Sequence, residues 1–426
     1  MKNYQQLLER ALTDAPYWVL RPLFEAKLRA GGIEPDSVMV DRLMEHIRQS
    51  PAKAFNWNNG QLDTINSHID LTFDEADMAD VEQQFTILLE KMPDIVANVA
   101  SEIASTLLDI WRDNWAKEWA QLVGERDSFN RRIALRWGKP LDLLRLMLRL
   151  SLDLGQEIAE ARAVHQSELH DVQTRLHVRA CQVTAEVLTL LENGFADGAM
   201  ARWRTLHEIC IVMLLMCEHG APIAERYLEH GHVEAMAGKE QYIICNDALG
   251  FPSFSKAEYH AIDVEYERVI ARYGKAFQAP YGWAAGFVPP GKRGRVGLGE
   301  LEQAAGRGAL ASHYRMASQN VHAGPNALYY RLGLLGEPGL LAGASDSGLT
   351  EPGQNTAMTF GLISILLIQD DVTMDHVIVM NALKLLREEI PIAFLRAEKQ
   401  ATPKPARSRL VKRYFGMNKR ERRPQR

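Results

Sequence analysis

The chain has 426 residues, of which 46% are hydrophobic, and a formal net charge of −5 at pH 7. This length leaves room for two or three domains with a sizeable core. The longest apolar run, Thr356 to Ile368, is shorter than the roughly 20 residues of a membrane span, and the four cysteines form no CxxC pair. We therefore expect a soluble protein in a reducing compartment, the cytoplasm, with no membrane contact.

Charge is distributed unevenly along the chain. Between Lys404 and Arg426 there are ten Lys or Arg residues and one Glu, a net charge of +9, so residues 1–403 carry −14. A basic tail on an acidic body favours contact with a polyanion, although it also serves solubility. We predict RNA or another polyanion as the partner of this tail, which binds through six residues: Lys412, Arg413, Lys419, Arg420, Arg422 and Arg423.

Helical periodicity dominates residues 1–160. Asp36 is placed to cap a helix. The stretch from Val81 to Val123 is predicted as helix with a division at Pro93, because proline disfavours helix in the residue before it, and Pro140 is predicted to start a new helix. Three tryptophans recur every four residues: Trp111, Trp115 and Trp119. Such an aromatic face is expected to pack against another helix in a core.

The second part of the chain is predicted as a helical bundle. A long helix from His165 to Asn193 is followed, after a short link, by a helix from Asp197 to Cys217, and so short a link requires antiparallel packing. Residues 274–299 are dense in Gly and Pro and are predicted as a loop, whereas residues 328–343 carry a β-hairpin signal. The predicted fold is an all-α multi-helix bundle with an N-terminal helical region (1–160), a bundle domain (165–400) and a basic tail (401–426).

Two polar clusters interrupt otherwise apolar helices. The first consists of Arg204, His207 and Glu208, and Arg204 and Glu208 share one helical face because they are four residues apart. The second consists of His313, Tyr314, Arg315, Ser318, Asn320 and His322. Because buried charges need partners, we expect Arg204 and Glu208 to meet Ser318 and His322 in one pocket. A structural ion pair between Arg204 and Glu208 is the alternative.

The sequence LLENGFADGAMARWRTLHEICIVMLLM, at residues 190–216, resembles the helical hairpin of the DUF5677 family, which has a Leu-rich helix, a Gly and an Arg-x-x-x-Glu helix. The later SQNVHAGP, at residues 318–325, resembles the Ser-x-x-Val-His segment of that family. The resemblance covers roughly residues 165–390. It implies an all-α domain with a polar site, in a family whose function is unknown.

A second resemblance, to HEPN domains, rests on Arg315-Met-Ala-Ser-Gln-Asn-Val-His322. HEPN domains are small helical bundles, often ribonucleases of bacterial phage-defence and stress systems, with an Arg and a His separated by a short spacer. Here Met316 departs from the polar residue usual after the Arg. The resemblance implies a metal-independent endoribonuclease without cofactor, in which His322 is the general acid or base and Arg315 the cation. Arg204 and Glu208 would complete the site, with Ser318, Asn320 and His207 around it.

Two other functions stay open. A non-enzymatic binding or scaffolding module would use the same polar residues as a satisfied pocket network, and self-association into a homodimer is compatible with either function. A metal site would draw on His230, His232 and Glu234 with His207 and Glu208, although His230 and His232 would project about 200° apart on a regular helix.

Overall fold

The structure is a computed structural model that describes residues 4–49, 71–163, 167–319, 321–322, 324–329, 331–334, 340–369 and 372–400. Every regular element within these ranges is a helix, which confirms the predicted all-α fold. Contacts between Cα atoms divide the chain into two compact units, Met1–Gln121 and Leu122–Arg426. The predicted domains 1–160 and 165–400 stay a prediction. No helix in the described part of the chain has the length and apolar content needed to cross a membrane.

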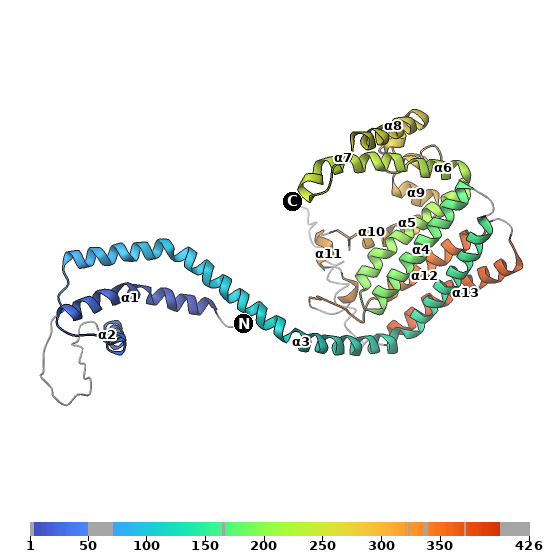
Figure 1. Ribbon diagram of the computed structural model, residues 1–426. Coiled ribbons are helices and arrows are strands. Elements are labelled where there is room, and N and C mark those ends of the chain that lie inside the picture. Colours follow the sequence, from blue (N-terminus) through green and yellow to red (C-terminus); the bar gives the residue numbers. More distant parts are fainter. Residues whose placement is uncertain are drawn as a thin grey trace, which may run out of the picture. The chain divides into compact units, whose positions relative to one another are not determined.

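Three helices contribute to the first unit: α1 (Tyr4–Ala30), α2 (Ser37–Gln49) and the beginning of α3 (Glu75–Arg162) (Figure 1). Its small core contains Leu28, Met39 and Leu43. Two polar contacts organise the connection between α1 and α2, one at the surface and one at the start of α2.

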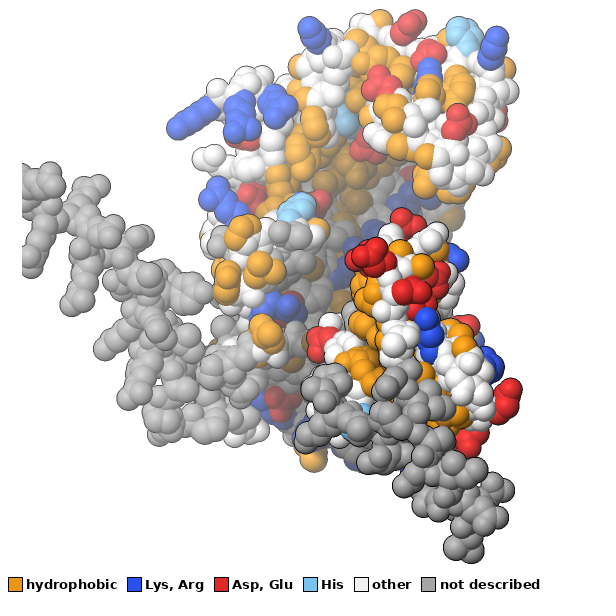
Figure 2. Space-filling model, turned by 90° about the vertical axis from the view of Figure 1, so that its left-hand side faces the viewer, with side chains coloured by type: hydrophobic (Ala, Val, Ile, Leu, Met, Phe, Trp, Pro, Cys, Tyr) orange, Lys and Arg blue, Asp and Glu red, His pale blue; other side chains and the backbone are white. Residues whose placement is uncertain are grey.

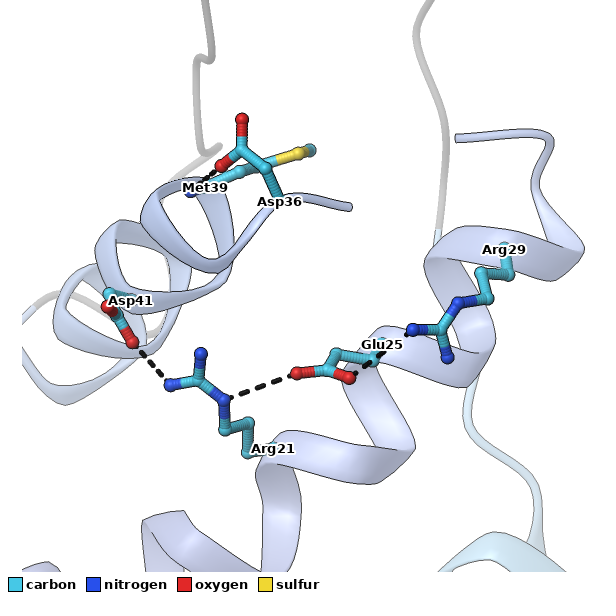
Figure 3. Close-up of polar contacts among 6 residues, drawn as sticks. All are labelled: Arg21, Glu25, Arg29, Asp36, Met39 and Asp41. Atoms are coloured by element: carbon cyan, nitrogen blue, oxygen red, sulfur yellow. Dashed lines mark hydrogen bonds and ion pairs between the residues drawn. The ribbon is translucent and has the colours of Figure 1, made fainter. Parts of the chain in front are cut away.

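In the surface contact, Arg21 Nε donates to Glu25 Oε1 at 3.2 Å, and the same guanidinium pairs with Asp41 of α2 (Figure 3). At the start of α2, the Asp36 carboxylate accepts a hydrogen bond of 2.6 Å from the Met39 backbone N–H. Asp36 is therefore the helix cap that the sequence predicts. The exposed ion pairs of Arg21 contribute at most about 1 kcal/mol to stability, so their main effect is to orient α1 and α2 relative to each other.

Helix α3 is continuous, whereas the sequence predicts breaks at Pro93 and Pro140. Each proline removes one backbone hydrogen bond but leaves the ladder on both sides intact, so the 88-residue helix accommodates both. A second expectation about α3 is also wrong. Trp111, Trp115 and Trp119 do not lie in a core, because 70%, 56% and 54% of their surfaces are exposed.

The main core of the second unit is formed by five helices: the end of α3, α4 (Glu168–Glu192), α5 (Ala196–His219), α12 (Thr350–Leu366) and α13 (Met374–Lys399). Helices α4, α5, α12 and α13 lie side by side (Figure 1). Trp203 of α5 is fully buried, and its indole N–H lies 3.0 Å from both the Asn355 carbonyl oxygen and Thr359 Oγ1. This contact fixes α5 against α12 at the centre of the bundle.

The link between α4 and α5 requires glycine at Gly194. Its φ is +74°, in the left-handed region, and a Cβ there would lie 2.7 Å from the Ser345 carbonyl oxygen. In return, the Gly194 carbonyl accepts a hydrogen bond of 2.9 Å from the Ser345 N–H. The Asp197 carboxylate, in the first turn of α5, accepts a hydrogen bond from the Leu332 N–H at 2.8 Å.

A smaller core covers one end of α5 and involves four further helices: α6 (Ala221–Glu229), α7 (Gly231–Leu249), α8 (Lys256–Tyr273) and α9 (Leu298–Ala304). The predicted loop 274–299 is packed into this core through four buried side chains: Phe277, Trp283, Val288 and Val296. The β signal at residues 328–343 is wrong within the described residues. Helix α11 (Pro325–Tyr329) and a 3₁₀ turn at Leu332–Leu334 occupy that region.

A buried histidine links three helices of the main core. His177 of α4 is 2% exposed, and its Nε2 lies 3.3 Å from Ser364 Oγ of α12. Ser364 Oγ in turn lies 2.9 Å from Ser151 Oγ of α3. Burial, aided by the positive charge of Arg162, lowers the pKa of His177 to about 4. The imidazole is therefore neutral in the folded protein at physiological pH.

We expect the free energy of unfolding to fall as pH is lowered from about 6.5 to 4. Unfolded His177 takes up a proton near its ordinary pKa of about 6.5, whereas the folded residue stays neutral down to about pH 4. The loss from this group should approach about 3 kcal/mol, and its pH dependence should vanish above about pH 7.5. Urea unfolding at several pH values should show a shallower dependence in His177→Gln. The exposed His260 gives the control, His260→Gln, and equal slopes in all three proteins would contradict the assignment.

Candidate functional site

Tyr314 connects the two polar clusters that the sequence singles out. It lies on α10 (Ala311–Gln319), which packs against α5. Its hydroxyl donates to Glu208 Oε1 and accepts from Arg204 Nε, both at 2.5 Å. Arg204 Nε also lies 3.3 Å from Glu208 Oε1, and its guanidinium carbon lies 4.7 Å from the centre of the Tyr314 ring. The ion pair between Arg204 and Glu208 is therefore present, and the tyrosine joins it to α10.

This triad is a satisfied network at the edge of the core. Burial raises the pKa of Tyr314, and the hydrogen bond to Glu208 raises it further, so the phenol keeps its proton and acts as a donor. The side chains of Arg204 and Glu208 are 28% and 40% exposed. Each of the three groups is already bonded to the other two, so the arrangement fixes α10 on α5.

His207 makes a second, deeper contact. Its side chain is fully buried between the rings of Trp203 and Tyr314, and Nε2 lies 2.8 Å from Glu302 Oε1 of α9. Burial lowers the pKa of His207 despite the nearby carboxylate. The imidazole is therefore neutral and donates its Nε2 proton to Glu302. His207 has no access to solvent and holds α9 against α5.

Arg315 and His322 differ from these residues because both are exposed. Within the described residues, neither side chain has a hydrogen-bond or ion-pair partner. The His322 backbone N–H, three residues past the end of α10, donates to the Ser318 carbonyl at 3.3 Å. The Ser318 hydroxyl donates to the Tyr314 carbonyl at 2.9 Å. Among the described residues, Tyr314 forms the hydrogen bonds between α5 and α10, and no hydrogen bond or ion pair joins Arg204 or Glu208 to Ser318 or His322.

Helix α10 is also fixed from a second side. His313 Nδ1 lies 2.9 Å from Glu351 Oε1, in the first turn of α12. Tyr314 and His313 thus bind neighbouring helices, while Arg315, the next residue, faces solvent. Arg315 is therefore an exposed cation on a helix that contacts two neighbouring helices, and the exposed His322 lies three residues past the end of that helix.

The histidines considered for a metal site have other partners. His230 Nε2 donates to the Ala279 carbonyl at 2.9 Å, and His232 Nε2 lies 3.7 Å from Glu265 Oε2. Among the residues that the structure describes, no three His, Cys, Asp or Glu side chains are grouped so that they could hold a metal ion. His207 and Glu208 do not join His230, because each is engaged elsewhere.

Several predicted site residues cannot be placed. Asn320 lies outside the described residues, as do the six basic residues of the tail from Lys412 to Arg423.

Two residues of the observed network were absent from the predicted site. Tyr314 belonged to the second polar cluster but was given no role, and Glu302 lies in a helix about a hundred residues from its partner. The one signal for Glu302 in the sequence is that a buried imidazole such as His207 needs a hydrogen-bond partner, which a carboxylate can supply.

The Tyr314 hydroxyl should contribute measurably to stability. We expect Tyr314→Phe to lower the free energy of unfolding by about 1–2 kcal/mol, because two hydrogen bonds are lost, one of them to a carboxylate. Hydrogen exchange should also become faster in α10. The matched control is Tyr329→Phe, at a tyrosine that is 76% exposed. If the two variants are equally stable, Tyr314 does not hold α10 in the proposed way.

Comparison with known proteins gives one match. No curated protein and no solved structure matches the chain. Residues 170–339, from α4 to a point ahead of α12, match the model of DUF5677, a family of unknown function. The match includes α5, α10, Tyr314 and Glu302, and it ends earlier than the roughly 390 expected from the sequence. The predicted resemblance to DUF5677 is thereby confirmed over residues 170–339.

Proposed function

We propose that this protein is a metal-independent endoribonuclease that acts through Arg315 and His322. The observation that supports the proposal is the contrast between bonded and unbonded side chains in and after α10. Tyr314 and His313 are bonded to neighbouring helices, whereas Arg315 and His322 are exposed and, among the described residues, unpartnered. Arg315 is carried by a helix that these contacts hold in place, and catalysis by positioned groups requires such free side chains on a fixed element.

The chemistry would use the RNA itself as the nucleophile. The 2′-oxygen attacks the neighbouring phosphorus, the bond from phosphorus to the 5′-oxygen breaks, and a 2′,3′-cyclic phosphate and a 5′-hydroxyl result. The His322 imidazole would take the 2′-hydroxyl proton or give a proton to the leaving oxygen. The Arg315 guanidinium would stabilise the negative charge of the pentacoordinate phosphorus. No metal ion takes part in this scheme.

Arg204 and Glu208 would then act as positioning residues. Both contact α10 through the Tyr314 hydroxyl, one residue before Arg315. Their role would be to hold α10 in place, as His207 holds α9. The biological setting that accompanies this chemistry is a bacterial phage-defence or stress response, with folded RNA as the substrate class.

The direct test is cleavage of RNA by the purified full-length protein in the presence of EDTA. We expect His322→Ala and Arg315→Ala each to reduce cleavage by about a hundredfold or more, the size of a typical general acid–base contribution. Two exposed residues outside α10 give matched controls, His260→Ala and Arg293→Ala, which should cleave like the wild type. Circular dichroism melts must show that all four variants fold. Folded, wild-type protein that leaves RNA intact would refute the ribonuclease.

A binding or scaffolding module is the second candidate, and one observation favours it. Arg204, Glu208 and Tyr314 satisfy one another, and His207 is paired with Glu302, so the polar groups of α5 need no substrate. Such a module would keep its partner when His322 is replaced by Ala and lose it when Tyr314→Phe loosens α10. The ribonuclease would show the reverse order of sensitivity.

The basic tail gives a separate test of the predicted polyanion partner. Residues 404–426 carry a net charge of +9. If the tail binds RNA, each phosphate contact contributes about −0.7 to the slope of log affinity against log salt concentration. Deletion of 404–426 should therefore weaken binding and flatten this slope, as measured by filter binding at several salt concentrations. An unchanged slope would mean that the tail does not contact RNA.

A further inference from the structure

Helix α3 carries an exposed aromatic ridge that the described structure leaves uncovered. Hydrophobic side chains reach the surface at many points of the molecule, mixed with charged ones (Figure 2). Scattered exposures of this kind need no explanation, but a contiguous patch does. On α3, large apolar side chains follow one another over three turns. We name this set the α3 ridge: Leu107, Leu108, Ile110, Trp111, Trp115 and Trp119, each between 38% and 70% exposed. All six belong to the first compact unit.

The spacing of the ridge determines which kind of surface fits it. Leu107, Trp111, Trp115 and Trp119 are separated by four residues each, so they form a row inclined to the helix axis rather than a straight seam. Two helices that each present such a row pack with an angle of about −50° between their axes. A second copy of α3 necessarily carries the same row. The ridge is therefore complementary to itself when two chains cross.

The exposed area is also suited to a two-chain contact. A buried aromatic side chain removes roughly 150–250 Å² from water, so the exposed parts of the three tryptophans supply roughly 350 Å² per chain. The three aliphatic side chains raise this to roughly 500 Å². Two chains together bury roughly 1,000 Å², the size at which biological interfaces begin. One ridge alone, against a polar surface, would not reach it.

Charge argues against a membrane or a nucleic acid as the occupant. Residues 101–119 contain four carboxylates (Glu102, Asp109, Asp113 and Glu118) and two cations (Arg112 and Lys117), a net charge of −2. Arg112 is already paired with Asp109 at 3.0 Å. Helices that bind membrane surfaces are rich in Lys and Arg on their polar face, and anionic lipids or phosphates would be repelled here.

We propose that the α3 ridge is the dimer contact of this protein, in which Trp111 and Trp115 of one chain cross the same residues of a second chain. The interface is isologous: the same surface serves on both sides of a two-fold axis. It buries three indoles per chain that are otherwise in water. The contact lies in the first unit and does not depend on the proposed ribonuclease chemistry.

Sedimentation velocity of the full-length protein over a wide concentration range tests the contact. We expect a concentration-dependent dimer for the wild type. The double variant Trp111→Glu/Trp115→Glu should weaken dimerisation at least about tenfold, because tryptophans near an interface centre dominate binding. The control is Leu135→Glu, a substitution of the same chemistry on α3 at a residue that is 87% exposed and outside the ridge. This control should dimerise like the wild type.

A second measurement locates the contact. With Trp115→Cys, at the proposed crossing, mild oxidation should produce a covalent dimer at concentrations where the wild type, with its four native cysteines, gives none. The proposal is overturned if the wild type is monomeric at every concentration, or if the double variant dimerises as well as the control. It is equally overturned if the wild type sediments with phosphatidylcholine vesicles in a ridge-dependent way, since the occupant would then be lipid.

Discussion

The burial of α5 is the constraint on which the second unit depends. This helix packs against α4, α6, α9, α10 and α12, and most of its residues from Leu206 to Met216 are out of contact with water. A buried polar group costs stability unless it is paired. Each polar side chain of α5 near the core therefore requires a partner from another helix, and these partners decide where the shorter helices lie. Tyr314 brings α10 to Arg204 and Glu208, and Glu302 brings α9 to His207.

The spacing and periodicity of residues close in sequence were enough to predict the helices and the hairpin of α4 and α5. The short link between the two helices predicted that α4 and α5 pack as an antiparallel hairpin. The spacing of Arg204 and Glu208 predicted their ion pair. The DUF5677 resemblance also rested on this hairpin. All of these features depend on residues that are close in sequence, where periodicity and spacing determine the geometry.

The partners across the fold could not be predicted in the same way. Tyr314 and Glu302 lie about a hundred residues from the groups they contact, and no periodicity relates them. The prediction that Arg204 and Glu208 meet Ser318 and His322 did not include Tyr314, the residue that joins α5 to α10. The tryptophans of α3 are a second case in which the sequence does not identify the contact partner. An apolar row predicts that a face will be covered, but it does not say whether the cover comes from the same chain.

Two buried histidines connect helices of this core through polar contacts. His177 of α4 and His207 of α5 each meet a polar group from another helix, and burial keeps each neutral. The His177 ring also packs directly on Gly155, where an added Cβ would lie 2.6 Å from its Cε1 atom. A neutral imidazole that is enclosed in this way can fix the register of two helices but cannot exchange protons with a substrate. Of the histidines in the two polar clusters, His313 is paired with Glu351 and His207 with Glu302. That leaves His322 as the exposed imidazole of these clusters with no partner among the described residues, which is why the proposed chemistry is placed there.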